Sequence, residues 1–106
     1  MNYRFMRIIL FFDLPSVSDA EKADYRHFTN RIKKMGFYMF QESVYVKLAM
    51  NSFACQSLEK EIKMNLPKSG MISLLVVTEK QFQSMTTLIG KKPTTVIDTD
   101  ERLIEL

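Results

Sequence analysis

Asp13 is the residue of this sequence whose type and place are best suited to chemistry. It ends the apolar stretch FMRIILFFD and precedes Leu14-Pro15, a pair that marks a loop. A carboxylate there is a hard oxygen ligand suited to Mg²⁺ or Mn²⁺, and a bound divalent ion can orient water and stabilise charge in phosphodiester cleavage. One carboxylate is a poor metal site, so this hypothesis needs two copies of Asp13 that converge across a two-fold axis. The alternative is an aspartate that only forms the turn before Pro15.

The other reactive side chains show no catalytic pattern. His27 is the only histidine and lies off the apolar stripe of its predicted helix, so we interpret it as a surface residue. Cys55 is the only cysteine and falls on an apolar helix face, which favours a core position. The sequence contains neither a glycine-rich phosphate loop nor a metal-binding cysteine pair.

Cysteine usage and hydropathy favour a cytoplasmic protein. A single cysteine excludes a disulfide framework within the chain, which is typical of a reducing compartment. The N-terminal apolar stretch is not interpreted as a signal peptide, because Asp13 and Pro15 end it without a small-residue cleavage site. No apolar run approaches the roughly 20 residues of a membrane span, so we expect no contact with a membrane.

The basic residues permit a nucleic-acid partner without requiring one, since the net charge is +3 and the pI is about 9.1. Arg26, Asn30 and Lys33 can share one exposed helix surface, and a dimer would double this surface into a track for phosphates. The alternative is that each basic cluster is only a solvated face. The candidate nucleic-acid contacts are Arg7, Arg26, Arg31, Lys33 and Lys34.

Hydrophobic spacing predicts the elements that position Asp13. The capping box Ser18–Glu21 begins a helix, whose apolar stripe runs to Met35 before Gly36 stops it. The predicted order is a strand at 5–13, a helix at 18–35, two strands within 37–48 joined around Gln41-Glu42, a helix capped by Asn51 or Ser52 and ended by Pro67, and a strand at 71–78 after Gly70. This βαββαβ order is the α+β, ferredoxin-like arrangement.

We expect a single ferredoxin-like domain over residues 1–106, with its core in about residues 1–78. The C-terminal extension, about residues 79–106, is predicted to contain a short helical piece at Gln81–Leu88, a loop at Gly90–Thr95 and a last strand at Val96–Leu106.

The predicted sheet is apolar on both faces. In the first strand, Ile8 and Leu10 share one face, while Ile9 and Phe11 share the other. Strands of this kind are usually buried on both faces, but the two helices cover only one. We therefore predict a homodimer in which a second copy covers the other face and the last strand pairs with the partner's edge. The alternative is a last strand that folds back on its own sheet.

Several segments together resemble a known family. FFDLP, KKMGF and above all FQESVYVKL are similar to the small CRISPR-associated protein Cas-two (Cas2), and TEKQF is similar to the version found with type II systems. The resemblance covers nearly the whole chain. It implies a ferredoxin-like homodimer with a swapped C-terminal strand. The implied role is a scaffold in spacer acquisition, which bridges dimers of the CRISPR integrase Cas-one (Cas1) and supports the double-stranded DNA fragment between them.

The resemblance also implies an alternative activity. Some members of the family are described as Mg²⁺- or Mn²⁺-dependent endonucleases that act on RNA or double-stranded DNA. The acidic position of the family falls on Asp13, and its serine after the second strand falls on Ser43. These two residues are therefore the candidate catalytic residues, with Asp13 as the candidate metal ligand. A third hypothesis, a small-molecule-sensing domain, is weaker because no ligand-binding glycine loop stands out.

Overall fold

The computed structural model describes residues 5–91, and its elements follow the predicted ferredoxin-like order. Their bounds are β1 Met6–Asp13, α1 Asp19–Lys34, β2 Tyr38–Gln41, β3 Val44–Ala49, α2 Ser52–Lys63, β4 Met71–Thr78 and α3 Glu79–Gln83. The predicted strand Val96–Leu106, on which the strand-swap hypothesis rests, lies outside the described residues.

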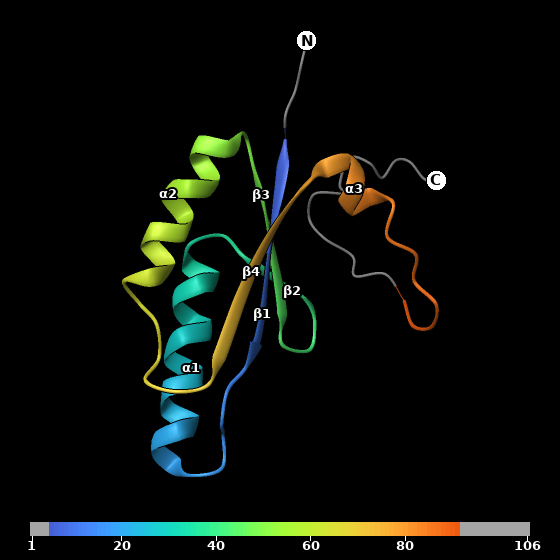
Figure 1. Ribbon diagram of the computed structural model, residues 1–106. Coiled ribbons are helices and arrows are strands. Elements are labelled where there is room, and N and C mark those ends of the chain that lie inside the picture. The colour runs from blue at the N-terminus through green and yellow to red at the C-terminus, as the bar shows by residue number, and fades with distance from the viewer. Residues whose placement is uncertain (1–4, 92–106) are drawn as a thin grey trace.

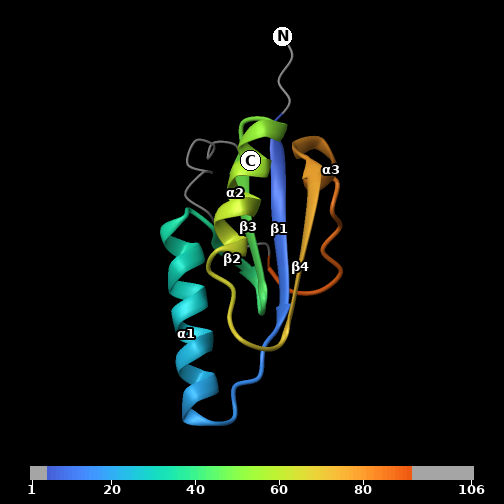
Figure 2. The same cartoon turned by 60° about the vertical axis from the view of Figure 1, so that its left-hand side comes forward.

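The strands form an antiparallel sheet in the order β2-β3-β1-β4, with β1 between β3 and β4 (Figure 2). Phe11 of β1 pairs with Val44 of β3 on one side and with Ser73 of β4 on the other. Asp13, the last residue of β1, pairs with Met71. The end of β1 therefore lies between the beginnings of β3 and β4.

The helices are divided between the two faces of the sheet. The helices α1 and α2 cover one face, and α3 lies on the other side (Figure 1). Between the sheet and the two long helices, Ile8 and Leu10 of β1 pack in one core cluster with Phe28, Ile32 and Ile62. Each fully buried side chain of this size contributes about 1.5–3 kcal/mol, so this core fixes the helices on the sheet. Within residues 5–91, no helix is long and apolar enough to cross a membrane.

Side-chain caps explain where the long helices begin. The Ser18 hydroxyl accepts the backbone N–H of Glu21 at 3.1 Å, and the Glu21 carboxylate accepts the backbone N–H of Ser18 at 3.0 Å. This geometry confirms the predicted capping box of α1. The cap of α2 is Asn51, whose side-chain oxygen accepts the backbone N–H of Ala54 at 2.8 Å.

Three predicted helix bounds were wrong. The helix α2 ends at Lys63, ahead of Pro67, with Met64 as its C-cap. The short helix α3 begins at Glu79 instead of Gln81 and ends at Gln83. The reason for the earlier start is a second capping box, in which the Thr78 hydroxyl accepts the backbone N–H of Gln81 at 3.0 Å.

The second face of the sheet, the one opposite α1 and α2, is apolar as predicted and only partly covered. Ile9 and Val46 are buried on this face, at 6% and 0% exposure. Phe11, Met71 and Leu75 remain open, at 41%, 68% and 50% exposure. The short helix α3 thus covers part of the face and leaves an apolar area beside it. Its burial by a second copy of the chain stays a prediction.

Candidate nucleic-acid and metal site

Asp13 is positioned by the aromatic residue that precedes it. The ring of Phe12 packs against the rings of Phe28, Tyr45 and Tyr25, with centroids 5.6, 5.5 and 6.0 Å away. Because side chains alternate along a strand, the anchoring of Phe12 in the core directs Asp13 toward the second face of the sheet. The Asp13 side chain is exposed there.

An open hollow of about 270 Å³ lies beside Asp13. It brings together the two candidate catalytic residues, Asp13 and Ser43, from β1 and from the turn between β2 and β3. Its lining combines one carboxylate and two hydroxyl groups with apolar side chains. We call it the Asp13 hollow, and it is lined by Phe11, Phe12, Asp13, Ser43, Val44, Met71 and Ser73.

Ser43 reaches the hollow through an unusual backbone conformation. Its φ of 62° is in the left-handed region, which residues other than glycine seldom adopt. Its carbonyl oxygen accepts the backbone N–H of Phe12 at 3.1 Å, so the turn is tied to the residue before Asp13. The part of the chain that the structure describes provides no hydrogen-bond partner for the Ser43 hydroxyl, which is therefore open to a ligand.

Ser73 is a lining residue that the sequence analysis did not single out. It lies on β4 directly opposite Phe11, on the same face of the sheet as Asp13. The alternation of β4 could have shown this placement, since a polar residue among Met71, Leu75 and other apolar residues of one face is conspicuous.

The Asp13 carboxylate can supply one ligand of a site for a hard divalent cation. Among residues 5–91, neither a hydrogen bond nor an ion pair occupies the Asp13 carboxylate. Mg²⁺ is commonly held by one or two carboxylates, with water and substrate phosphates as its other ligands. The described residues contain no cluster of three or more His, Cys, Asp or Glu side chains. A metal ion at Asp13 therefore needs a second copy of the chain or nucleic-acid phosphates to complete its ligands.

Arg7 does not fit the expectation that it contacts nucleic acid. It is 5% exposed, and its guanidinium donates to both carboxylate oxygens of Glu79 and to the Tyr38 hydroxyl. The guanidinium carbon lies over the ring of Phe82, 4.5 Å from the ring centroid. Burial lowers the pKa of Arg7, but the hydrogen bonds and charges of Glu79 and Tyr38 outweigh burial and raise the pKa overall. A cation that is buried and paired in this way is not available to a phosphate, so we leave Arg7 out of the proposed surface.

The other four candidate contacts lie on α1 and are exposed. Within residues 5–91, the ion pairs are Arg7–Glu79 and Lys63–Glu59, so no described carboxylate neutralises these four cations. Three of them lie in the last turn of the helix, where the macrodipole favours positive charge. We call this group the basic surface of α1, made of Arg26, Arg31, Lys33 and Lys34.

The basic surface of α1 and the Asp13 hollow lie on opposite sides of the sheet. The helix α1 covers the first face (Figure 1), whereas the hollow opens on the second face. The structure therefore brings Asp13 and Ser43 together and keeps the cations of the same chain apart from them. Contacts with a nucleic acid at α1 and chemistry at Asp13 therefore stay two separate predictions.

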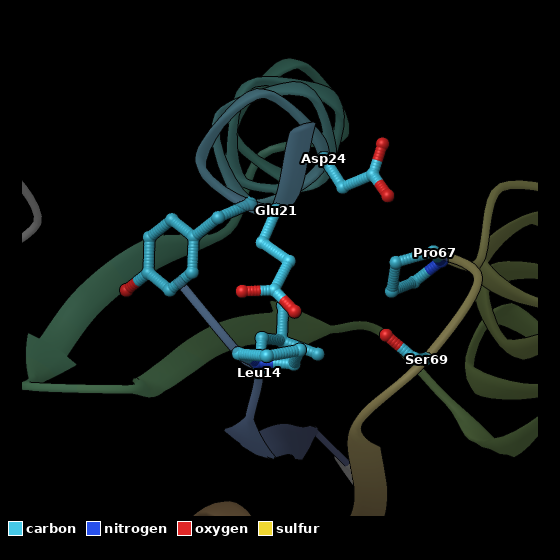
Figure 3. A pocket seen from close by; sticks show the side chains of 7 residues that line it. Leu14, Glu21, Asp24, Pro67 and Ser69 are labelled. Carbon is cyan, nitrogen blue, oxygen red and sulfur yellow. The ribbon is translucent and has the colours of Figure 1, made fainter. Parts of the chain in front are cut away.

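A much smaller cavity lies between the beginning of α1 and the loop before β4 (Figure 3). Two carboxylates line it, but Glu21 accepts the backbone N–H groups of Val17 and Ser18 at 3.0 Å. The carboxylate of Asp24 points away from Leu14, which forms the floor. The cavity has a volume of about 10 Å³ and holds at most one water molecule. Glu21 therefore serves the helix end, and no metal site follows from this small cavity.

The two remaining reactive residues lie as predicted. His27 is exposed on α1, and Cys55 is buried in the core at 6% exposure. Burial raises the pKa of the Cys55 thiol, which keeps it in its unreactive protonated form.

The fold and the site define a class of protein: a ferredoxin-like domain with a carboxylate at the end of β1, beside an open apolar sheet face. Residues 6–85 match the family model described as CRISPR associated protein Cas2. Because this match covers most of the chain, the protein belongs to the Cas2 family.

Relatives of similar length support the family assignment. The chain is 43% identical to a protein of Treponema denticola over 95% of this chain and 100% of that one. It is 44% identical to a protein of Streptococcus mutans serotype c over 95% and 93% of the two chains. It is 40% identical to a protein of Ligilactobacillus salivarius over 95% and 100% of the two chains. All three relatives are named CRISPR-associated endoribonuclease Cas2.

Proposed function

We propose that this protein is a homodimeric scaffold of CRISPR adaptation, which bridges dimers of the integrase Cas1 and binds a double-stranded DNA fragment during spacer acquisition. The observation that carries this proposal is the apolar area left open on the second face. Phe11, Met71 and Leu75 expose 41–68% of their surface on one side of a small domain. Exposed apolar areas of this kind mark association surfaces. Membership of the Cas2 family supports the assignment of a second copy to this surface.

The basic surface of α1 supports the nucleic-acid part of the proposal. Its cations are exposed on α1, which covers the face opposite the proposed dimer surface (Figure 1), so dimer formation leaves them exposed. Two copies present eight such side chains to a phosphate backbone. Contacts of this kind give affinity without reading sequence. Since spacer acquisition acts on DNA inside the cell, the proposed location is the cytoplasm.

A pair of leucine substitutions tests the dimer surface. Leu75 on the second face and Leu66 in the loop before β4 are almost equally exposed, at 50% and 49%. We expect Leu75→Glu to weaken dimerisation at least about tenfold, because it places a charge in an apolar contact. Leu66→Glu is the matched control and should dimerise like the wild type in sedimentation experiments. Equal dimerisation of all three proteins would show that the second face is not the interface.

The Asp13 hollow favours a second candidate function, a Mg²⁺- or Mn²⁺-dependent endonuclease that acts on RNA or double-stranded DNA. The observation that carries it is the placement of an unengaged carboxylate and a free serine hydroxyl, Asp13 and Ser43, in one hollow of the described chain. The names of the relatives point in the same direction. A metal ion at Asp13 would supply an activated water and charge stabilisation, and this chain would supply the carboxylate that holds the ion.

The nuclease candidate is tested by Asp13→Asn, with Asp24→Asn as the control of equal charge change on α1. We expect cleavage of RNA or DNA by wild type and Asp24→Asn in Mg²⁺, and loss of cleavage in Asp13→Asn. The latter variant should still dimerise and bind DNA. If the wild type cleaves neither substrate in Mg²⁺ or Mn²⁺, Asp13 is a turn residue and the nuclease candidate is wrong, whereas the scaffold proposal stands.

A further inference from the structure

Gly70 lies directly against the backbone of Asp13. It precedes β4 and has a φ of +100°, a left-handed conformation that favours glycine. A Cβ atom at this position would lie 2.6 Å from Cδ2 of Leu14 and 2.9 Å from the carbonyl oxygen of Asp13. The Leu14 side chain can rotate away from such a Cβ atom, but the carbonyl oxygen of Asp13 belongs to the backbone and cannot move in this way. The close approach of β4 to the end of β1 therefore leaves no room for a side chain at residue 70.

This contact matters because no group of the described residues holds the Asp13 carboxylate itself. Its oxygens have neither a hydrogen bond nor an ion pair within residues 5–91. The place of the carboxylate consequently depends on the backbone that carries it. On the β3 side, that backbone is held by the hydrogen bond from the Phe12 N–H to the Ser43 carbonyl at 3.1 Å. On the β4 side, it is held by pairing with Met71 and by contact with Gly70.

We propose that Gly70 is a positioning residue for Asp13: its missing side chain lets β4 close on the end of β1 and holds the carboxylate at the hollow. The inference rests on the second candidate function, in which Asp13 is a metal ligand. Figure 3 shows Ser69, the neighbour of Gly70, and Leu14, the neighbour of Asp13, on two sides of the small cavity. On the β4 side of the contact, Asp13 pairs with Met71, the residue that follows Gly70.

The chain contains a matched control for this position. Gly90 has a φ of +103°, almost the same as that of Gly70, but a Cβ atom there would have no neighbour within 4 Å among residues 5–91. Gly70→Ala and Gly90→Ala therefore both place an alanine at a strained, positive φ, and only the first introduces a clash among the described residues. Gly70→Asn is a second variant with a Cβ atom, in the residue type that enters the left-handed region most readily after glycine.

The test is a titration of the full chain with Mn²⁺, followed by the paramagnetic broadening of backbone amide signals in NMR spectra. In the wild type and in Gly90→Ala, we expect the Asp13 and Ser43 signals to broaden at the same Mn²⁺ concentration. Gly70→Ala and Gly70→Asn should need at least about tenfold more Mn²⁺, an energy difference of about 1.4 kcal/mol, while their spectra remain those of a folded protein. Asp13→Asn should abolish the local broadening.

The outcomes separate this inference from the function on which it rests. If the wild type responds to Mn²⁺ at Asp13 and both Gly70 variants respond equally well, the inference is wrong and the metal site stands. If the wild type itself shows no local broadening, the metal site is wrong and the inference falls with it. Should Gly70→Ala fail to fold, the double variant Gly70→Ala with Leu14→Ala removes the 2.6 Å contact and leaves the contact with the Asp13 carbonyl. That folded variant should still bind Mn²⁺ more weakly, and binding equal to wild type would overturn the inference.

Discussion

Arg7 and Glu79 lie 72 residues apart in the sequence and form a two-point ion pair on the second face of the sheet. Arg7 is almost fully buried, and its guanidinium also contacts the Tyr38 hydroxyl and the Phe82 ring. The pair joins β1 to the beginning of α3, whose first backbone N–H donates to the Phe5 carbonyl at 2.9 Å. These contacts fix α3 on the sheet and determine how much of the second face stays open.

The first prediction concerns this ion pair. Glu79→Gln removes the partner of a buried charge, which typically costs about 3–5 kcal/mol for fully buried pairs. Because the Glu79 side chain is 27% exposed, solvent screens part of the loss, and we expect about 2–3 kcal/mol. Urea unfolding at fixed protein concentration measures the difference. Glu59→Gln is the control, since its pair with Lys63 is exposed and is worth at most about 0.5 kcal/mol. Equal losses in the two variants would contradict the structural role of Arg7.

The second prediction concerns the basic surface of α1. Binding to duplex DNA should weaken as salt rises, with a slope in log–log form of about −0.9 for each phosphate contact. Arg26→Ala combined with Lys33→Ala should make the slope shallower by about 0.9 for each phosphate that the variant no longer neutralises, and equally for unrelated DNA sequences. Fluorescence anisotropy over a range of salt concentrations measures both effects. Lys60→Ala with Lys63→Ala removes the same charge from α2. If this variant made the slope shallower by the same amount, the net charge of the protein, and not the basic surface of α1, would account for DNA binding.

The third prediction follows from the capping box of α1. The backbone N–H groups of Ser18 and Val17 donate to Glu21 and lower the pKa of its carboxyl below the ordinary value of 4.5. A lowered pKa in the folded state gives stability that is present above pH 4.5 and is lost as pH falls through the folded-state pKa. We therefore expect Glu21→Gln, which keeps a neutral acceptor at the cap, to lose less stability than wild type on acidification from pH 5. Thermal melting of both proteins between pH 3 and 7 measures this, and parallel curves would contradict the prediction.

The fourth prediction concerns Cys55, whose pKa is raised by burial. In the native protein, its reaction with a thiol reagent should be at least about a hundredfold slower than in urea, because both exposure and the thiolate fraction are low. Absorbance after addition of Ellman's reagent at pH 8 measures the rate. Fast reaction of the native protein would show that the packing of α2 on the sheet opens readily.

The sequence predicted the parts of the fold that depend on near neighbours. The capping box Ser18–Glu21 needs residues three apart, and the alternation in β1 needs residues two apart, so both patterns are visible in one sequence. The start of α3 was missed although its cap, Thr78 with Gln81, has the same spacing. In that case the apolar strand that runs to Thr78 concealed the cap.

Long-range pairs account for what the sequence did not predict. Arg7 was expected to contact phosphate because it is one of the basic residues. Its true partner, Glu79, lies 72 residues away, and no local pattern in the sequence indicates that pairing. The contact of Gly70 with Asp13 likewise depends on the register of β1 against β4. The resemblance to the Cas2 family, and not spacing, singled out Ser43, and the hollow that Ser43 shares with Asp13 became visible only with the strands in place.

The central claim, a homodimeric scaffold of spacer acquisition, is tested most directly by the mass of the complex formed from this protein, the integrase Cas1 and a double-stranded DNA fragment. We expect analytical ultracentrifugation to show one assembly that contains two copies of this chain, and to show its loss with Leu75→Glu but not with Leu66→Glu. A chain that sediments as a monomer and joins neither the integrase nor the DNA would contradict the account.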